Sequence, residues 1–270
     1  DAATSLGIAV INAPAGNTIA VAELFFGTVL SLLRHIPRAT TSMHAGRWER
    51  AQLLGTELKG KTLGIVGVGR IGGEVAQRAL AFGMHVVGYD PYVADARFTA
   101  LRIPRAASLD ELLDQADIVT VHTPLNDETT GMIGRRELGR LKPGAILCNL
   151  ARGGITSDDA LVAALESGRL RGAVLDVYQK EPLVGDHPFA KFDNVVLTPH
   201  IGASTAEAQR NVAVDVCIAV RDALLSGELS RSLNVAEVSG REWRELEGAL
   251  GVARRAAAIA RAILAGQGMR

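Results

Sequence analysis

Apolar residues along most of this chain form short β-branched runs, and these runs alternate with stretches of helical spacing. Several runs are apolar at consecutive positions, as strands covered by helices on both faces must be. Such alternation implies right-handed crossovers and a parallel sheet. The sequence therefore predicts an α/β fold with a doubly wound, Rossmann-type parallel sheet. The expected strands are Ile8–Ile11, Leu63–Val66, His85–Tyr89, Ile118–His122, Ala145–Asn149, Ala173–Asp176 and Val195–Leu197.

Helices are predicted between and around these strands from the spacing of their apolar residues. Acidic residues near the start of two of them suit helix N-termini. Pro37 is expected to end the first long helix, and Gly227 follows the end of the second. The last stretch is amphipathic and is expected to lie on another domain. The predicted helices are Thr18–His35, Ile71–Ala81, Ser108–Gln115, Ser157–Ser167, Ser204–Leu225 and Arg241–Leu264.

Composition and charge argue against several classes of protein. The 270 residues carry 29 Lys and Arg against 29 Asp and Glu, so the formal net charge is zero. This balance disfavours a nucleic-acid or anionic-membrane partner bound through a basic surface. The longest apolar run, Thr18–Leu33, contains Glu23 and is shorter than a membrane span. Cys148 and Cys217 are far apart and have no metal-ligand spacing, so we expect a reducing, cytoplasmic location and no metal.

Two glycine-rich segments are candidates for phosphate binding, and only one has the right context. Gly55–Thr62 matches the pattern GxxxxGK[ST], but it runs straight into a strand, whereas a P-loop needs a strand before it and a helix after it. Gly67, Gly69 and Gly72 instead follow a strand and open a helix. They suit a tight turn, a close approach to a pyrophosphate and close helix–strand packing. We therefore predict a dinucleotide site; a glycine-rich turn that binds nothing is the alternative.

Asp90 ends the next strand and bears on the choice of cofactor. A carboxylate at this place accepts hydrogen bonds from an adenosine ribose diol and repels a 2′-phosphate. Pro91 and Tyr92 follow it in place of an arginine. The sequence therefore favours NAD over NADP, and replacing Asp90 with Ser together with an added Arg should move the preference to NADPH.

Ligands of a doubly wound sheet bind outside the carboxyl ends of its strands, where several polar residues fall. Arg152 follows one strand and precedes two glycines, and its guanidinium suits a substrate carboxylate or carbonyl oxygen. His200 follows another strand and suits a general acid–base, and a carboxylate such as Glu181 beside it would fix its tautomer. A structural salt bridge for Arg152 and a structural role for His200 remain the alternatives at this point.

With these residues, the chain resembles the D-isomer-specific 2-hydroxyacid dehydrogenases over essentially its whole length. The resemblance implies hydride transfer between C2 of a 2-hydroxy acid and the nicotinamide of NAD. The motifs that carry it are Ile11–Thr18, Gly46–Arg50, Lys61–Gly72, Tyr89–Pro91, Val121–Pro124, Asn149–Gly154, Leu175–Val177, Lys180–Pro182 and Pro199–Ser204.

The resemblance also implies a role for individual residues. Arg152 would bind the substrate carboxylate and carbonyl oxygen, His200 would exchange the hydroxyl proton, and Glu181 would hold and tune His200. Asp90 would contact the ribose and Asp176 the carboxamide of the nicotinamide. The other implied cofactor contacts are Gly67, Gly69, Arg70 and Ile71 (the last two on the pyrophosphate), Gly72, His122, Thr123, Pro124, Leu150, Ala151, Gly202 and Ala203.

Within the family, Gly46–Arg50 and the stretch from Ser232 onward resemble the branch that oxidises D-3-phosphoglycerate at the start of serine biosynthesis. In that branch Arg50 would reach a substrate phosphate across a dimer, with a solvated surface charge as the alternative. Trp48 would pack against a neighbouring subunit. We expect a homodimer or homotetramer that acts on a small 2-hydroxy or 2-keto acid, with the Thr18–His35 helix and the Trp48 segment at the interface.

The resemblance divides the chain into the end of a substrate-binding lobe at 1–14, an NAD-binding domain at 15–202, a return segment of that lobe at 203–236 and the start of a further domain at 237–270. The rest of the lobe lies before the segment that matches Asp1, so we expect this chain to bind NADH but to turn over poorly. A glyoxylate or hydroxypyruvate reductase, an NAD-binding fragment without catalysis and a cofactor-sensing, co-repressor-like scaffold are the alternatives.

Overall fold

A sheet of six parallel strands organises residues 17–208 of the computed structural model, which describes residues 2–229, 231–235, 248, 251–252 and 255–256. The strand order is β2-β1-β3-β4-β5-β6. It reverses between β1 and β3, the kind of switch point at which doubly wound sheets bind ligands. The predicted Rossmann-type fold is confirmed. The strands are β1 Thr62–Val66, β2 His85–Tyr89, β3 Ile118–Val121, β4 Ala145–Asn149, β5 Leu170–Leu175 and β6 Val195–Leu197.

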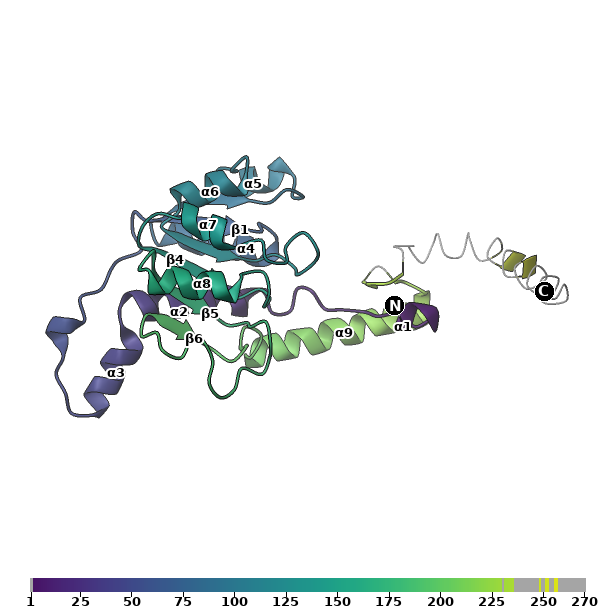
Figure 1. Cartoon of the computed structure of the whole chain (residues 1–270). Helices are drawn as coiled ribbons and strands as arrows, with labels where there is room; N and C mark the ends of the chain where they lie inside the picture. Colours follow the sequence, from purple (N-terminus) through teal and green to yellow (C-terminus); the bar gives the residue numbers. More distant parts are fainter. Residues whose placement is uncertain (1, 230, 236–247, 249–250, 253–254, 257–270) are drawn as a thin grey trace, which may run out of the picture. The chain divides into compact units, whose positions relative to one another are not determined.

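Helices cover both faces of this sheet (Figure 1). Because successive strand residues face opposite sides, Ile65 and Val66 on β1 belong to different core clusters. One cluster joins the sheet to α2 (Thr18–Leu33), α4 (Arg70–Ala81) and α5 (Asp95–Leu101). The other joins it to α6 (Leu109–Gln115), α7 (Arg135–Arg140) and α8 (Asp158–Glu166). The expected helices at Ile71–Ala81, Ser108–Gln115 and Ser157–Ser167 are present with ends shifted by one residue or less, whereas α5 and α7 were not predicted.

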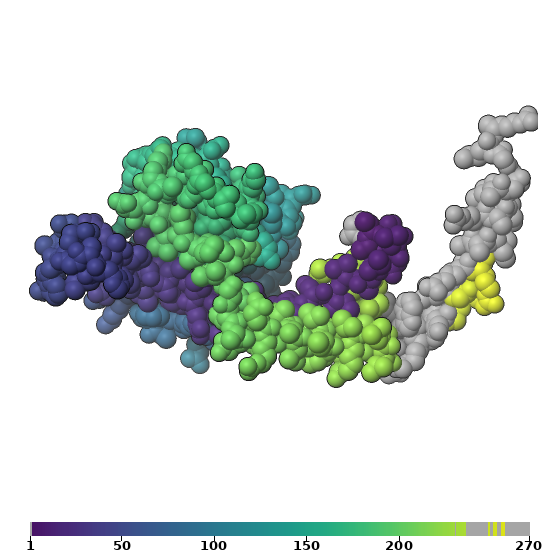
Figure 2. Space-filling model, turned by 90° about the horizontal axis from the view of Figure 1, so that it is seen from below, coloured from purple at the N-terminus to yellow at the C-terminus, as the bar shows by residue number. Residues whose placement is uncertain are grey.

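Pro37 does not end the first long helix, which corrects the expectation for Thr18–His35. The helix α2 ends at Leu33, and Pro37 lies in the first turn of a second helix, α3 (Ile36–His44). Proline fits a first helical turn because its missing N–H has no helical acceptor there. His35, with φ of 55°, makes the break between the two helices. The helix α3 and the short 3-10 turn at Arg50–Gln52 project from the sheet (Figures 1 and 2).

The helix α2 packs its apolar side chains into the core of its own chain. Val21, Phe25 and Val29 are buried, and the helix contacts α4, β5 and β6. The subunit interface expected at this helix therefore does not involve these three side chains.

Residues 1–16 and 209–270 form the second compact unit. Its described part contains α1 (Ala2–Ser5) and most of α9 (Ala206–Ser226), the helix expected at Ser204–Leu225. The strand expected at Ile8–Ile11 is absent from the sheet: Ile11 makes only an isolated antiparallel bridge to Ser232. Within the described residues this run meets the segment 231–233, where the Leu233 N–H donates to Val10 O at 2.8 Å. The domain limits 1–14, 15–202, 203–236 and 237–270 stay a prediction, and the helix expected at Arg241–Leu264 lies almost entirely outside the described residues.

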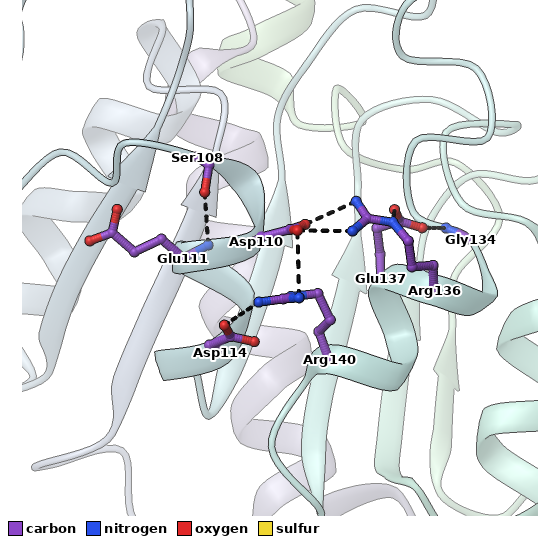
Figure 3. Close-up of polar contacts among 8 residues, drawn as sticks. All are labelled: Ser108, Asp110, Glu111, Asp114, Gly134, Arg136, Glu137 and Arg140. Atoms are coloured by element: carbon purple, nitrogen blue, oxygen red, sulfur yellow. Dashed lines mark hydrogen bonds and ion pairs between the residues drawn. The ribbon is translucent and has the colours of Figure 1, made fainter.

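Figure 3 shows how α6 and α7 are joined at the surface by ion pairs. Arg136 donates to both carboxylate oxygens of Asp110 at 2.8 and 2.9 Å, and Arg140 pairs with Asp114. Hydrogen bonds from Arg136 lower the pKa of Asp110. Ser108 caps α6 by accepting the N–H of Glu111 at 3.1 Å. These exposed pairs link the surfaces of α6 and α7, which contact each other on one side of the sheet.

Two expectations drawn from composition concern membranes and cysteines. Among the described residues, no single helix is long and apolar enough to cross a membrane; the pair α2–α3, bent by 64°, meets that test by length and composition only. Cys148 is buried and Cys217 exposed, and both are free thiols. A cytoplasmic location stays a prediction.

Candidate active site and cofactor crevice

The glycine-rich loop after β1 has the shape that its spacing predicts. Gly67 turns the chain with φ of 94°, and a Cβ there would lie 2.7 Å from the carbonyl oxygen of His122. A Cβ on Gly72 would lie 2.1 Å from Gly67 O, so only glycine lets α4 approach β1 this closely. A Cβ on Gly69, in contrast, would meet nothing within 4 Å. The loop therefore opens onto free space at its second glycine.

The start of α4 faces that space without a side-chain cap. Gly69 is the N-cap residue, and having no side chain it offers no cap to the first turn of the helix. Uncapped N–H groups at a helix N-terminus bind phosphate oxygens through hydrogen bonds and the helix dipole. The loop and helix thus provide both the room and the donors that a pyrophosphate needs. Arg70 and Ile71 lie in this first turn, where the sequence placed them.

Asp90, after β2, holds the glycine-rich loop as well as facing the crevice. Its Oδ2 accepts the N–H of Val68 at 2.9 Å, and its Oδ1 accepts the N–H groups of Tyr92 and Val93 at 3.0 and 3.1 Å. The residue is buried. Three amide donors orient its carboxylate, so a ribose diol would meet an acceptor already fixed in place.

His122 and Thr123 follow β3, on the other side of the switch point. Burial lowers the pKa of His122 to about 4, so the ring is neutral at pH 7. Its Nε2 lies 3.0 Å from Thr120 Oγ1, and its ring meets Phe25 edge-on. The His122 side chain therefore belongs to the core. Nδ1 of His122 and Oγ1 of Thr123 are buried and have no hydrogen-bond partner among the described residues.

His200 and Glu181 form a hydrogen-bonded pair beyond β6 and β5. Nδ1 of His200 lies 2.6 Å from Glu181 Oε2, while Glu181 Oε1 accepts the N–H of Tyr178 at 2.9 Å. Burial alone would raise the pKa of Glu181, but the hydrogen bonds from His200 and Tyr178 and the charges of His200 and Arg152 outweigh it, and the net pKa is lowered. An ionised carboxylate only accepts, so Nδ1 carries the hydrogen and Nε2 remains for proton exchange.

Asp176 fixes the loop that carries His200. This carboxylate, 1% exposed, accepts from Thr198 Oγ1 at 2.6 Å and from the N–H groups of Ile201 and Gly202 at 2.8 and 2.9 Å. His200 itself has φ of 54°, a left-handed conformation that costs energy in a residue with a side chain. The hydrogen bonds on either side of His200 hold it in this conformation.

Arg152 lies on a loop that the Asn149 side chain shapes. Asn149 accepts the N–H of Ala151 at 3.1 Å and donates to Arg152 O at 3.0 Å. The next residue, Gly153, touches the Glu181 loop: a Cβ there would lie 1.8 Å from Tyr178 O. Arg152 is consequently brought near the Glu181–His200 pair, and its charge contributes to the lowered pKa of Glu181.

A cavity of about 660 Å³ adjoins the pair. Glu181, His200 and Tyr178 line it together with apolar side chains such as Leu183 and Leu197. Among the described residues, no three His, Cys, Asp or Glu side chains are grouped as a metal site would require. The cavity can therefore hold a small molecule against the Glu181–His200 pair.

The family model for the D-isomer specific 2-hydroxyacid dehydrogenase NAD binding domain matches residues 26–202. The chain belongs to this family. The resemblance drawn from the motifs is confirmed, and NAD is the cofactor of the matched domain. The free space at Gly69 and the uncapped start of α4 fit that cofactor.

Curated relatives within the family are longer proteins. D-3-phosphoglycerate dehydrogenase of Bacillus subtilis is 50% identical over 220 residues, which are 80% of this chain and 41% of that protein. The enzyme of the same name from Archaeoglobus fulgidus is 47% identical over 214 residues, 79% of this chain and 40% of that protein. The chain thus spans about two fifths of the length of these relatives.

Solved structures of the family share the fold. D-mandelate dehydrogenase from Rhodotorula graminis, in a holo form, gives a TM-score of 0.80 at 31% identity, covering 88% of this chain and 72% of that one. D-lactate dehydrogenase from Aquifex aeolicus, complexed with NAD and lactic acid, gives 0.78 at 30% identity, covering 88% and 76%. A glyoxylate reductase gives 0.78 at 37% identity, covering 86% and 70%.

The structure brings most of the family's implied site residues to the edge of the sheet where the strands end. Their individual contacts with substrate and cofactor stay predictions. Three residues with a positioning role were not assigned one from the sequence: Asn149, Tyr178 and Thr198. Asn149 and Thr198 stand in or beside quoted motifs, but no spacing rule indicates what their side chains bind. The residues at this edge are Gly67, Gly69, Arg70, Ile71, Gly72, Asp90, His122, Thr123, Pro124, Leu150, Ala151, Arg152, Asp176, Glu181, His200, Gly202 and Ala203.

Arg50 is not part of this cluster within the chain. It lines a different cavity, of about 820 Å³, with Arg34, Trp48 and Leu54. None of these residues lines the cavity beside Glu181 and His200. A contact between Arg50 and a substrate phosphate would need a second subunit, as the resemblance implies.

Proposed function

We propose that this chain is the cofactor-binding and acid–base part of a D-3-phosphoglycerate dehydrogenase, which oxidises D-3-phosphoglycerate to 3-phosphohydroxypyruvate with NAD. The observation that carries the proposal is the convergence of Arg152, Glu181 and His200 from the loops after three successive strands. These loops lie at the same edge of the sheet as the glycine-rich loop. The identity of 44–50% to relatives named D-3-phosphoglycerate dehydrogenase supports this substrate.

The chain's own residues provide the positioning and the proton transfer. Bound NAD supplies the acceptor for the hydride from C2 of the substrate. Arg152 binds the substrate carboxylate and the C2 oxygen through charge-assisted hydrogen bonds. Nε2 of His200 takes the hydroxyl proton, because Nδ1 is committed to Glu181. Glu181 stays ionised and stabilises the imidazolium that forms.

The acid–base role is tested by replacing His200 with Ala in a chain extended to its natural coding limits. We expect kcat with D-3-phosphoglycerate to fall by about 10²–10⁴-fold while the Kd for NADH stays unchanged. His187→Ala is the matched control, since His187 lines the same cavity outside the pair. Equal loss in both variants, or full activity of His200→Ala, would contradict the assignment. If the cellular function of the protein were unchanged in His200→Ala, the cofactor-sensing scaffold would be favoured.

The second candidate is a glyoxylate or hydroxypyruvate reductase, favoured by the 37% identity to a solved glyoxylate reductase. The two are separated by NADH oxidation with phosphohydroxypyruvate and with hydroxypyruvate. Strong preference for the phosphorylated acid supports the first proposal. Equal rates, or a preference for hydroxypyruvate, would leave the roles of Arg152, Glu181 and His200 as proposed and assign a different substrate.

Assembly into a homodimer is the remaining part of the proposal. Trp48 is 78% and Leu54 88% exposed, and both line the cavity that holds Arg50. Large apolar side chains exposed next to a cavity are typical of a subunit contact. Trp48→Ala should shift the mass measured by light scattering toward the monomer and raise KM for the phosphorylated substrate. An unchanged mass would contradict this interface.

A further inference from the structure

Arg97, on α5, reaches across to the glycine-rich loop. Its Nη2 donates to Gly69 O at 3.1 Å, and its Nε lies 3.5 Å from Val68 O. Arg97 stands seven residues after Asp90, whereas the residues that directly follow Asp90 are Pro91 and Tyr92. A cation therefore lies against the same loop that faces the cofactor.

Gly73 makes room for this contact. A Cβ on Gly73 would lie 2.2 Å from Nη2 of Arg97 and 3.1 Å from its Cζ. Any side chain in the first turn of α4 at this position would push the guanidinium off the loop. Gly73 is thus a fourth glycine of this loop and helix start, and its lack of a side chain makes room for Arg97 rather than for the backbone turn.

Asp90 and Arg97 hold the same loop residue from two sides. The N–H of Val68 donates to Asp90 Oδ2, while the C=O of Val68 faces Arg97 Nε. Opposite charges therefore flank one residue of the loop, at the end of the crevice where Asp90 would meet the adenosine ribose. Arg105 is near as well, but its donors are directed to Asp95 and to Asp90 O.

The guanidinium of Arg97 keeps donors for a ligand. Arginine has five N–H groups in a planar fork that matches phosphate oxygens, and the two loop contacts involve only Nε and Nη2. Its Nη1 makes no hydrogen bond within the described part of the chain. A phosphate on the ribose would thus find a pre-positioned cation across Val68 from the repelling Asp90 carboxylate.

We propose that Arg97 is the group that receives a phosphate at the adenosine ribose, so that Asp90 and Arg97 acting in opposition set the choice between NAD and NADP. The inference rests on the cofactor site of the proposed function and not on its substrate. It changes the expectation that an arginine must be added along with the loss of Asp90. Removal of the Asp90 charge alone is then enough to admit NADPH.

The test measures the Kd of NADH and of NADPH by calorimetry on the 270-residue chain. Arg97→Gln should raise the Kd for NADPH at least tenfold and change that for NADH by less than threefold. Arg102→Gln is the matched control, since Arg102 is an exposed arginine at the end of the same helix. Asp90→Asn should lower the Kd for NADPH at least tenfold, and adding Arg97→Gln to it should abolish that gain. Arg97→Lys, which keeps the charge but not the fork, should retain part of the NADPH binding.

Each result decides the question. If Arg97→Gln weakened the binding of NADH and of NADPH equally, Arg97 would only stabilise the loop, and the proposal would be overturned. The proposal would also be overturned if neither the unmodified chain nor Asp90→Asn bound NADPH. If Arg97→Gln does not fold, Arg97→Lys provides the comparison instead. Failure of the unmodified chain to bind NADH would refute the cofactor site itself, a different outcome from loss of NADPH selectivity.

Discussion

Two glycines three residues apart should respond to the same substitution in opposite ways. Gly69→Ala adds a methyl group where no atom of the chain lies within 4 Å, at a φ of −70° and a ψ of −147°. Gly72→Ala adds it 2.1 Å from Gly67 O and 3.2 Å from Ile65 Cγ2. The first methyl group therefore fills the space meant for the cofactor, and the second forces the helix α4 away from the strand β1.

The expected sizes follow from these contacts. To relieve the clash at Gly72, the backbone must open by roughly 1 Å, and overpacking of this kind costs about 1–3 kcal/mol. For a unit of this size, about 1 kcal/mol shifts Tm by about 2–4 °C, so Gly72→Ala should lower Tm by about 2–12 °C. Gly69→Ala has no clash to relieve, so its cost in stability is limited to the backbone strain at that ψ, about 1 kcal/mol. Its methyl group should instead raise the Kd for NADH at least about tenfold, which corresponds to about 1.4 kcal/mol.

Thermal melts without ligand and NADH titrations of both variants distinguish the two effects. Gly72→Ala should lose stability and cofactor affinity together, whereas Gly69→Ala should lose cofactor affinity with the smaller change in Tm. The reasoning is refuted if Gly69→Ala lowers Tm as much as Gly72→Ala does, or if Gly69→Ala binds NADH like the unmodified chain.

Three further predictions concern carboxylates. Asp176→Asn sets an amide nitrogen against groups that donate to Asp176, so the free energy of unfolding should fall by about 1–3 kcal/mol and kcat should fall with it; urea titration and turnover check this. Burial tends to raise the pKa of Asp117, but the hydrogen bonds from the Thr62 N–H and from Lys142 lower it on balance. The contribution of this carboxylate to stability is therefore fully present above the ordinary carboxyl pKa, and it is lost as the pH falls through the lowered pKa of Asp117. Asp117→Asn should therefore flatten the loss of stability below about pH 4, as followed by urea titration at several pH values. Arg136→Ala breaks the bidentate pair to Asp110 shown in Figure 3, yet it should leave the unfolding midpoint unchanged because the pair is exposed and screened; a clear drop would show that the network acts cooperatively.

Local rules were enough to predict the sheet and the glycine-rich loop. The strands β2, β4 and β6 have the predicted limits, because buried parallel strands read as short apolar runs. Gly67, Gly69 and Gly72 could be given separate roles since each role depends on geometry within a few residues.

Contacts between loops from different strands could not be predicted in this way. Gly153 must be small because Tyr178, from the next strand's loop, lies against it, and Gly73 must be small because Arg97 lies over it. Pro37 failed as a helix end because a proline suits a first turn equally well; α2 already ends at Leu33, and His35 makes the break before α3. The sequence identifies the residues at the site, and the folded chain decides which of them support the others.

Two carboxylates that follow strands, Asp90 and Asp176, each hold a loop in place at opposite ends of the crevice. Each accepts three hydrogen bonds from neighbouring loops: Asp90 from the glycine-rich loop and its own turn, Asp176 from the loop that carries His200. A carboxylate offers about four acceptor positions, so each retains about one for the cofactor. Asp90 can therefore give a ribose one well-oriented hydrogen bond rather than several. Its preference for NAD must then come mainly from charge repulsion of a 2′-phosphate, which is the term that a neighbouring arginine is able to offset.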